Sequence, residues 1–316
     1  MIAVAALLVG AAITSPHVLR LESAHPASAA IIWLSALCLR ALVALFVALL
    51  AIFYVSTTPG FHHVTHWCWH AAVPLVTSGF GLSGHRVGDL ALLAPLLALA
   101  VSLVAVCVSL WRATRAIGDW VRRTSIGTGA HESLVVGEND IVVAVAGLRH
   151  PRVIVSSGAL TCFDDEELEA SLAHERGHIA RRHRFVLVAA EICRALARPL
   201  PGTRRAVAEL IFHLERDADR WAVQRKHDPT ALASAICKAA QPNAGSGGPL
   251  LTLNGGAVVR RVQQLLDCTT PPRRRARLDV LAATMVLIAI ALAAALPSAT
   301  RAAMAGQGST VHPCDH

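Results

Sequence analysis

Eight cysteines occur in the 316-residue sequence, but no two of them have the CxxC spacing of a paired-cysteine metal site. Cys38 and Cys107 fall in apolar stretches, and four more fall in a stretch that we expect to be cytoplasmic: Cys162, Cys193, Cys237 and Cys268. Disulfides are rare in the cytoplasm, so these cysteines are expected to be small core residues. Cys68 and Cys314 both lie on the side of the membrane that we expect to be outside the cytoplasm, and a disulfide between them is one alternative.

Basic residues are scarce outside residues 112–277. The remainder of the sequence holds four of them: Arg20, Arg40, Arg86 and Arg301. Residues 112–277 hold 25 basic and 17 acidic residues, so the whole net charge of +8 belongs to this segment. Arginine clusters lie at both of its ends, next to apolar stretches: Arg112, Arg115, Arg122, Arg123, Arg273, Arg274, Arg275 and Arg277. Such clusters mark the cytoplasmic side of membrane spans. No nucleic-acid-binding motif accompanies the charge, so we expect a lipid bilayer and no direct nucleic acid partner.

Long apolar stretches are abundant. The mean hydropathy is +0.51 and 54% of the residues are hydrophobic, more than in an ordinary soluble domain. A membrane span needs about 20 predominantly apolar residues, and four stretches meet or approach this length: about 1–18, 31–55, 89–111 and 278–297. We therefore expect a mainly α-helical, multi-pass cell-membrane protein. Its parts are a membrane region at 1–111, a cytoplasmic domain at 112–277, a fourth span at 278–297 and a short disordered extracytoplasmic tail at 298–316.

Three details of these stretches leave alternatives open. The first stretch is short and resembles the apolar core of a signal peptide, although no basic residues precede it. Arg40 is costly in mid-bilayer, so either the second span begins after it or its side chain reaches the inner surface. His62, His66 and His70 in the outer loop suit a metal or haem contact, but we favour an interfacial segment because tryptophans lie among them.

The segment at 112–277 changes its pattern along its length. Three short β-rich runs at 134–136, 141–146 and 153–155 are broken by glycine or proline and predict a small sheet. Asp164 and Glu167 then have the spacing of a helix capping box, ahead of an apolar stripe at helical period. Further helices are expected at 185–197, 203–226, 229–240 and 257–267, with a flexible loop at 241–256. The domain is therefore α+β.

The helix that begins at the capping box contains His174-Glu175-Arg176-Gly177-His178, an HExxH pattern. Histidines four residues apart lie on one helix face, so both can bind one zinc ion. Glu175 between them would be the general base for the attacking water. The pentapeptide alone also arises by chance in a chain with 16 histidines.

A catalytic zinc needs a third protein ligand. The helix expected at 203–226 contains Glu215 and Asp219 on one face, so Glu215 would complete a two-histidine, one-glutamate site. Asp219 would accept a hydrogen bond from a ligand imidazole. Asp217 lies about 200° around the helix from Glu215 and is expected to be solvated. Without the upstream HExxH, an exposed charged face paired with Arg216 and Arg220 would be the better interpretation.

These motifs resemble those of a known family. The HExxH pattern followed by E-x-x-A-D at 215–219, with the segments 147–158 and 164–168, resembles the BlaR/MecR-type antirepressor peptidases, membrane gluzincins with three spans before the protease domain and one after it. The resemblance implies a mini-gluzincin domain with one Zn²⁺ per chain, held by His174, His178 and Glu215, with Glu175 as base. It also implies a substrate-binding edge strand formed by Val153, Ile154, Val155, Ser156 and Ser157.

Two departures limit the resemblance. His183 stands where an acidic residue often follows the motif, which puts an ion pair there in doubt. About 20 residues follow the fourth stretch, so we expect no penicillin-binding sensor domain. The leading hypothesis is a zinc endopeptidase with a cytoplasmic-side active site that cleaves a protein such as a BlaI/MecI-like repressor. The alternatives are an HtpX-like or CAAX-protease-like quality-control protease and a non-catalytic signalling protein with a structural zinc site.

Overall fold

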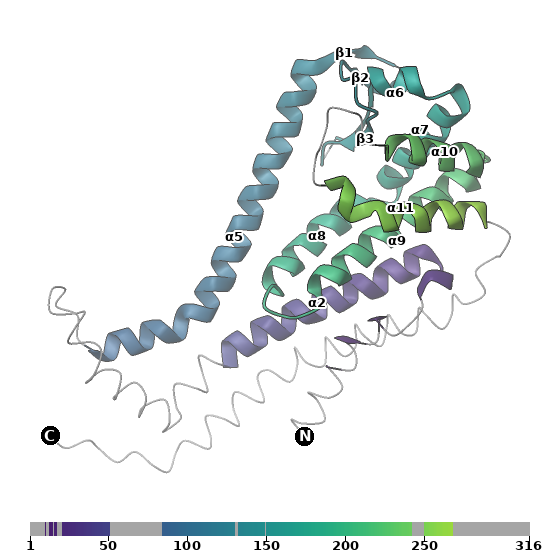
Figure 1. Ribbon diagram of the computed structural model, residues 1–316. Coiled ribbons are helices and arrows are strands. Elements are labelled where there is room, and N and C mark those ends of the chain that lie inside the picture. Colours follow the sequence, from purple (N-terminus) through teal and green to yellow (C-terminus); the bar gives the residue numbers. More distant parts are fainter. Residues whose placement is uncertain are drawn as a thin grey trace, which may run out of the picture.

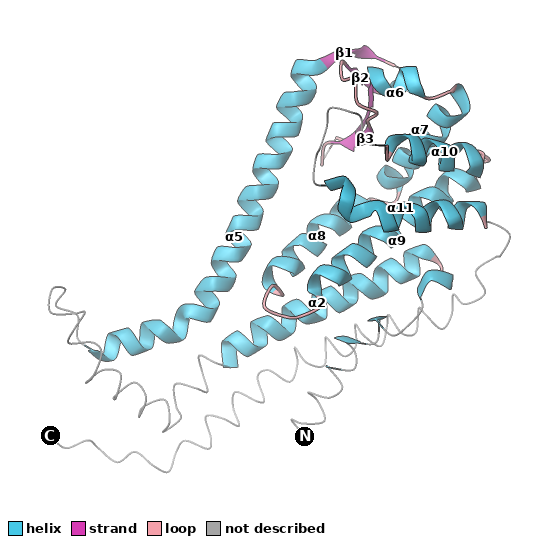
Figure 2. Ribbon diagram, in the orientation of Figure 1, coloured by secondary structure: helices cyan, strands magenta, loops and turns pink. Residues whose placement is uncertain are grey.

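The computed structural model describes residues 10, 13–14, 16–17, 21–50, 84–129, 132–148, 150–241 and 250–267. These residues are mostly helical, with one small sheet at one end of the molecule (Figure 2). Most of the expected first span, the His-rich outer loop, the fourth span and the tail lie outside the described residues. The same holds for Cys68 and Cys314. A mainly helical protein with a small sheet is therefore confirmed for the described part of the chain.

Among the described residues, two helical segments are long and apolar enough to cross a membrane: Pro26–Leu49 in helix α2 (Pro26–Leu50) and Leu96–Thr124 in helix α5 (Gly84–Thr124). The apolar stretch of α2 is 50% buried inside the protein, whereas that of α5 is 6% buried. Helix α5 continues beyond Trp111 through the following arginines, so the expected third span is one part of a longer helix. Four spans were expected, and two candidates lie in the described residues.

Helix α2 follows a short 3-10 turn, η1 (Leu21–Ser23), and lies along helices α8 (His183–Leu196) and α9 (Thr203–Gln224) (Figure 1). Its side chains Ile32, Trp33 and Leu37 are buried in one core with Ala206 and Leu210 of α9. The first part of the expected second span thus packs on the helices of the expected soluble domain.

Arg40 lies farther along α2 and is also buried. Its Nη2 donates to the carbonyl oxygen of Ile13 at 3.1 Å and lies 2.8 Å from Nε2 of His17. The guanidinium therefore ties α2 to the preceding segment rather than reaching into open space.

The sheet contains β1 (Ser125–Thr128), β2 (Leu134–Val136), β3 (Val143–Ala146) and β4 (Arg152–Ser156), in the spatial order β1-β2-β4-β3. Strand β4 is parallel to β2 and antiparallel to β3. Three of these strands coincide with the expected β-rich runs, whereas β1 was not anticipated. β1 is exposed along its whole length, so it lacks the apolar alternation that marks a strand in a sequence.

The prediction that residues 153–157 form an edge strand is wrong. Strand β4 lies between β2 and β3 and pairs with both, so it is an inner strand of the sheet. Ser156 caps helix α6 (Ser157–Cys162) by accepting from the N–H of Ala159, and its hydroxyl donates to the carbonyl of Asp140. Ser157 donates to the carbonyl of Glu138. The outer strand on this side of the sheet is β3.

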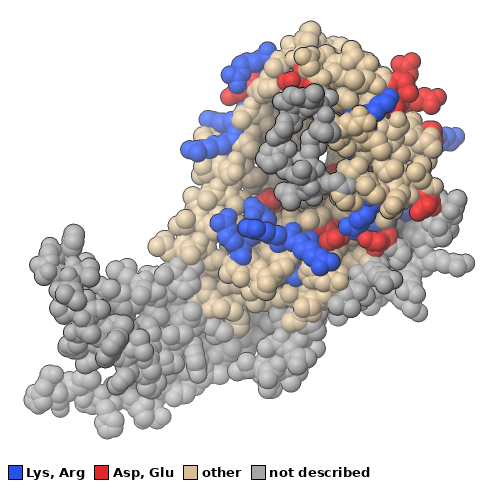
Figure 3. All heavy atoms as spheres, in the orientation of Figure 1, with Lys and Arg blue, Asp and Glu red and all other residues tan. Residues whose placement is uncertain are grey.

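The remaining helices are α7 (Asp165–Ala180), α10 (Pro229–Ala239) and α11 (Leu250–Leu266). Ala173 of α7, Leu232 of α10 and Leu265 of α11 belong to one buried cluster. Helix α11 begins at Leu250, inside the stretch predicted to be a loop. On the face drawn in Figure 3, charged side chains gather across the upper and middle parts, and the described surface below them is mostly uncharged.

Candidate metal centre

The helix that carries the HExxH pattern begins as the sequence predicts. Asp164 caps α7 by accepting from the N–H of Glu167 at 2.8 Å, and the Glu167 carboxylate accepts from the N–H of Asp164 at 3.0 Å. Glu167 is itself buried against Lys238 and Ser234 of α10, which anchors the start of the helix. His174 and His178 therefore lie one turn apart on a helix whose origin is fixed.

A close helix crossing brings α9 to these histidines. Gly177 is buried against α9, and a Cβ placed on it would lie 3.2 Å from Cα of Ala218 and 3.3 Å from Cβ of Trp221. A side chain at Gly177 would therefore force a shift at this helix crossing. The small residues Gly177 and Ala218 thus let α9 approach α7 closely enough for Glu215 to reach His174 and His178.

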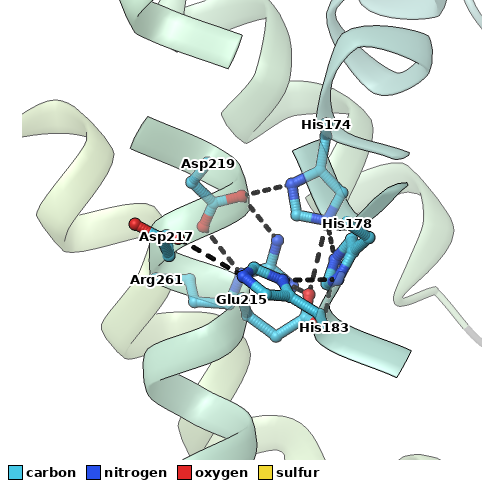
Figure 4. Close-up of polar contacts among 7 residues, drawn as sticks. All are labelled: His174, His178, His183, Glu215, Asp217, Asp219 and Arg261. Atoms are coloured by element: carbon cyan, nitrogen blue, oxygen red, sulfur yellow. Dashed lines mark hydrogen bonds and ion pairs between the residues drawn. The ribbon is translucent and has the colours of Figure 1, made fainter. Parts of the chain in front are cut away.

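His174, His178 and Glu215 converge on one point (Figure 4). The two Nε2 atoms are 3.1 Å apart, Nε2 of His174 is 3.4 Å from Oε2 of Glu215, and Nε2 of His178 is 3.5 Å from Oε1 of Glu215. Four donors placed tetrahedrally around zinc at 2.0–2.1 Å lie about 3.3–3.4 Å from one another. The donor set and its spacing therefore fit a zinc ion.

The outer nitrogen of His174 faces a carboxylate. Its Nδ1 lies 2.8 Å from Oδ1 of Asp219, which is buried. Arg261 of α11 spans this aspartate, with Nε 3.0 Å from Oδ2 and Nη2 2.7 Å from Oδ1, and its Nη1 lies 2.8 Å from Oε2 of Glu215. Sequence reasoning missed Arg261. One signal was present: the positions three and four residues away on its helix hold no carboxylate, so its partner had to come from another element.

The outer nitrogen of His178 faces a second histidine. Arg182 adopts a left-handed backbone with φ 56°, and this turn after α7 places His183 at the start of α8 against His178. The two Nδ1 atoms are 3.0 Å apart, and Nε2 of His183 lies 3.3 Å from Oδ2 of Asp217. Arg181 also contacts Asp217 at 3.5 Å.

The prediction that Asp217 is solvated is wrong, because it is 2% exposed. The helical rotation correctly placed it away from the metal side of α9, but α8 covers the face on which it lies. In place of the ion pair that His183 put in doubt, the imidazole of His183 contacts the carboxylate of Asp217.

Glu175 lies beside the three donors and is half-buried. Burial, with the negative charge of Glu215 adding to it, raises the pKa of Glu175 to about 7. Its carboxylate accepts a hydrogen bond from the N–H of Val145 in strand β3. A carboxyl group with a pKa near neutrality can both take and return a proton, as a general base and acid must.

The pKa values of the three candidate ligands are shifted in different directions. Burial opposes the charge on His174, but Asp219 and Glu215 raise its pKa to about 10. Burial and the neighbouring His174 lower the pKa of His178 to about 4, so it stays neutral. Burial would raise the pKa of Glu215, yet the contacts from His174 and Arg261 hold it well below its usual range. The site thus gathers one cation, one neutral imidazole and one carboxylate, and a divalent ion can replace the proton on His174.

Comparison with known proteins indicates the class of the site. Residues 115–209 match the family model of peptidase family M48, and this stretch includes the HExxH pattern but ends before Glu215. The chain is 30% identical over 126 residues to a protein named protease HtpX homolog from Desulfotalea psychrophila, a match that covers 34% of this chain and 44% of the relative. The chain therefore spans less than half the length of this relative. No solved structure matches the chain.

These matches indicate a metallopeptidase domain. The residues matched by the family model include His174, Glu175 and His178 of the candidate site. Nothing in them points to the BlaR/MecR subfamily in particular.

Proposed function

We propose that this protein is a zinc-dependent endopeptidase of the cell membrane, with its active site on the cytoplasmic side. His174, His178 and Glu215 are the metal ligands, and Glu175 is the catalytic base. The observation that carries this proposal is the meeting of two imidazoles and one carboxylate at tetrahedral spacing beside Glu175. The arginine clusters that flank 112–277 support the cytoplasmic assignment.

The residues divide the chemistry among themselves. Zinc held by His174, His178 and Glu215 would supply Lewis-acid chemistry at the scissile carbonyl and at the attacking water. Glu175 takes the proton from the attacking water and delivers it to the leaving amine, a role that its pKa of about 7 allows. Asp219 holds the ring of His174 through Nδ1, which leaves Nε2 to face the metal.

His183 has the corresponding role for His178. A ligand that binds through Nε2 carries its proton on Nδ1, and this proton is donated to Nδ1 of His183. His183 then carries its own proton on Nε2 and donates it to Asp217. The buried carboxylate at the end of this chain selects one tautomer for both rings.

The substrate binds to β3 in place of β4. Strand β3 is one of the two outer strands of the sheet, and the N–H of Val145 in β3 already points at the Glu175 carboxylate. In a strand, alternate residues point their backbone groups the same way, so the N–H and C=O of Val143 and the C=O of Val145 offer hydrogen bonds to an extended peptide, while the N–H of Val145 serves Glu175. This arrangement lays the scissile bond across the metal ligands of α7.

The structure of the site does not identify the physiological substrate, so its class is inferred from sequence similarity. Similarity to the HtpX homolog favours, weakly, a quality-control peptidase that acts on membrane proteins. Cleavage of a BlaI/MecI-like repressor is supported by the motif resemblance alone. A non-catalytic protein with a structural zinc site is the remaining alternative, and it predicts that Glu175 is dispensable.

The test is proteolysis by the full chain, purified in detergent, with casein and an unfolded membrane protein as substrates. We expect Glu175→Gln to lower the cleavage rate by at least about a hundredfold, because the general base is lost while the charge-neutral amide keeps the shape. Zinc content should stay unchanged in this variant. Full proteolysis by Glu175→Gln would refute the mechanism, and zinc binding without any proteolysis by the natural chain would favour the structural-zinc alternative.

A further inference from the structure

Two adjacent arginines of α11 contact different parts of α9. Arg261 faces Glu215 and Asp219 in the second half of α9. Arg260 faces the first half: its Nη2 lies 3.3 Å from Oε2 of Glu209, and its guanidinium lies 3.8 Å from the ring centre of Phe212. Because neighbouring residues of a helix point about 100° apart, the position of one arginine fixes the rotation of α11 and hence the position of the other.

Arg260 has a further partner in the N-terminal segment. Its Nη2 lies 2.7 Å from Oε1 of Glu22, which belongs to the turn η1 before α2. The backbone of this turn is fixed, because Leu21 and Ala24 are buried in the core shared by α2, α8 and α9. Arg216 of α9 also donates to the carbonyl of Glu22 at 2.8 Å.

The chain of contacts therefore runs from the N-terminal segment to the candidate metal ligand. Glu22 contacts Arg260, the next residue Arg261 contacts Glu215, and Glu215 contacts both His174 and His178. The link through Arg261 is well shielded, since its side chain is 14% exposed, whereas Glu22 is 59% exposed. A partly exposed carboxylate of this kind can gain or lose its partner without unfolding the core.

We propose that Glu22 is a positioning residue for the metal centre, which acts through Arg260 and Arg261 on Glu215. This rests on the proposed function, because Glu215 is a zinc ligand only under that proposal. Glu22 follows the stretch expected to form the first span and lies on the expected cytoplasmic side. Loss of the Glu22–Arg260 ion pair thus changes the rotation of α11 and the placement of a metal ligand.

Zinc affinity of the full chain in detergent, measured by competition with a chelator, tests the proposal. We expect Glu22→Gln to weaken zinc binding about threefold and Arg260→Gln about five- to tenfold, in line with a partly exposed ion pair and an indirect effect on a ligand. The double variant should bind zinc as Arg260→Gln does, because the side-chain ion pair of Glu22 is with Arg260, whereas its contact with Arg216 is made by the backbone carbonyl, which both variants keep. Glu169→Gln, an exposed acid on α7 itself, is the matched control and should leave the affinity unchanged.

A second readout separates positioning from general destabilisation. Cobalt(II) in place of zinc should show a shifted visible absorption in Glu22→Gln, whereas the midpoint of thermal unfolding of the metal-free protein should change little. Equal affinity in Glu22→Gln and the natural chain, or strictly additive effects in the double variant, would overturn the positioning role. Absence of zinc binding by the natural chain would instead remove the proposed function and the positioning role together.

Discussion

His183 offers a sharp test of the site because it contacts no metal and yet should control metal affinity. In the structure, Nδ1 of His183 is 3.0 Å from Nδ1 of His178, and its Nε2 is 3.3 Å from Asp217. His183→Ala removes the acceptor for the Nδ1 proton of His178. It also removes one partner of the buried Asp217 and leaves its contact with Arg181 in place.

The size of the effect follows from these contacts. A buried donor left without an acceptor costs about 1–3 kcal/mol, and loss of an outer partner of a zinc-binding histidine typically lowers metal affinity about 10- to 100-fold. Since each tenfold change corresponds to about 1.4 kcal/mol, the two ranges agree. We therefore expect His183→Ala to raise the zinc dissociation constant 10- to 100-fold. His183→Asn should recover part of this loss, because its amide can accept from His178 and donate to Asp217.

The assay is chelator competition on the full chain in detergent at neutral pH. His150→Ala, an exposed histidine in the loop between β3 and β4, is the control for the loss of any imidazole. If His183→Ala binds zinc as tightly as the natural chain, the tautomer argument fails. If His183→Ala and His183→Asn are equally weak, the hydrogen-bond chain to Asp217 does not carry the effect.

Two further predictions concern packing and pH. Gly177→Ala places a methyl 3.2 Å from Cα of Ala218, so it should cost about 1–3 kcal/mol in the free energy of unfolding and weaken zinc binding. Gly118→Ala in α5 has no atom within 4 Å of the new methyl and should not destabilise the protein; equal effects of the two variants would contradict the close crossing. Burial and the charge of Arg216 lower the pKa of His213 in the folded protein to about 3. As the pH drops below 6.5, the unfolded state therefore binds a proton that the folded state does not. The free energy of unfolding then falls by about 1.4 kcal/mol per pH unit until the folded-state pKa is reached. Thermal unfolding between pH 8 and 5 should show this loss in the natural chain and less of it in His213→Asn; identical pH profiles would exclude His213 as its source.

Local signals in the sequence predicted the HExxH helix well. The capping box of Asp164 and Glu167, the shared face of His174 and His178, and the pairing of Glu215 with Asp219 on one helix depend on residues within one or two turns. Helical geometry alone determines these relations. It also determines that Asp217 points away from Glu215.

Relations between distant elements could not be predicted in the same way. Whether Asp217 meets water or another helix depends on α8, and whether β4 is an edge depends on its partners β2 and β3. Arg182 adopts a left-handed backbone with φ 56°, a conformation that a sequence usually signals by glycine. This turn brings His183 to His178. Arg261 lies more than forty residues after Glu215 in the chain, in a helix that begins inside a stretch rich in glycine and serine.

The central claim is that two helices supply three ligands to one zinc ion, and Glu215 is the ligand that the family match does not reach. The most direct measurement is the zinc content of the purified full chain by elemental analysis after removal of loosely bound metal. We predict about one zinc per natural chain, and almost none in Glu215→Ala, since a three-ligand site reduced to two histidines binds weakly. Glu191→Ala, which removes a half-buried carboxylate of α8, should keep its zinc. Full zinc content in Glu215→Ala would contradict the site as assigned.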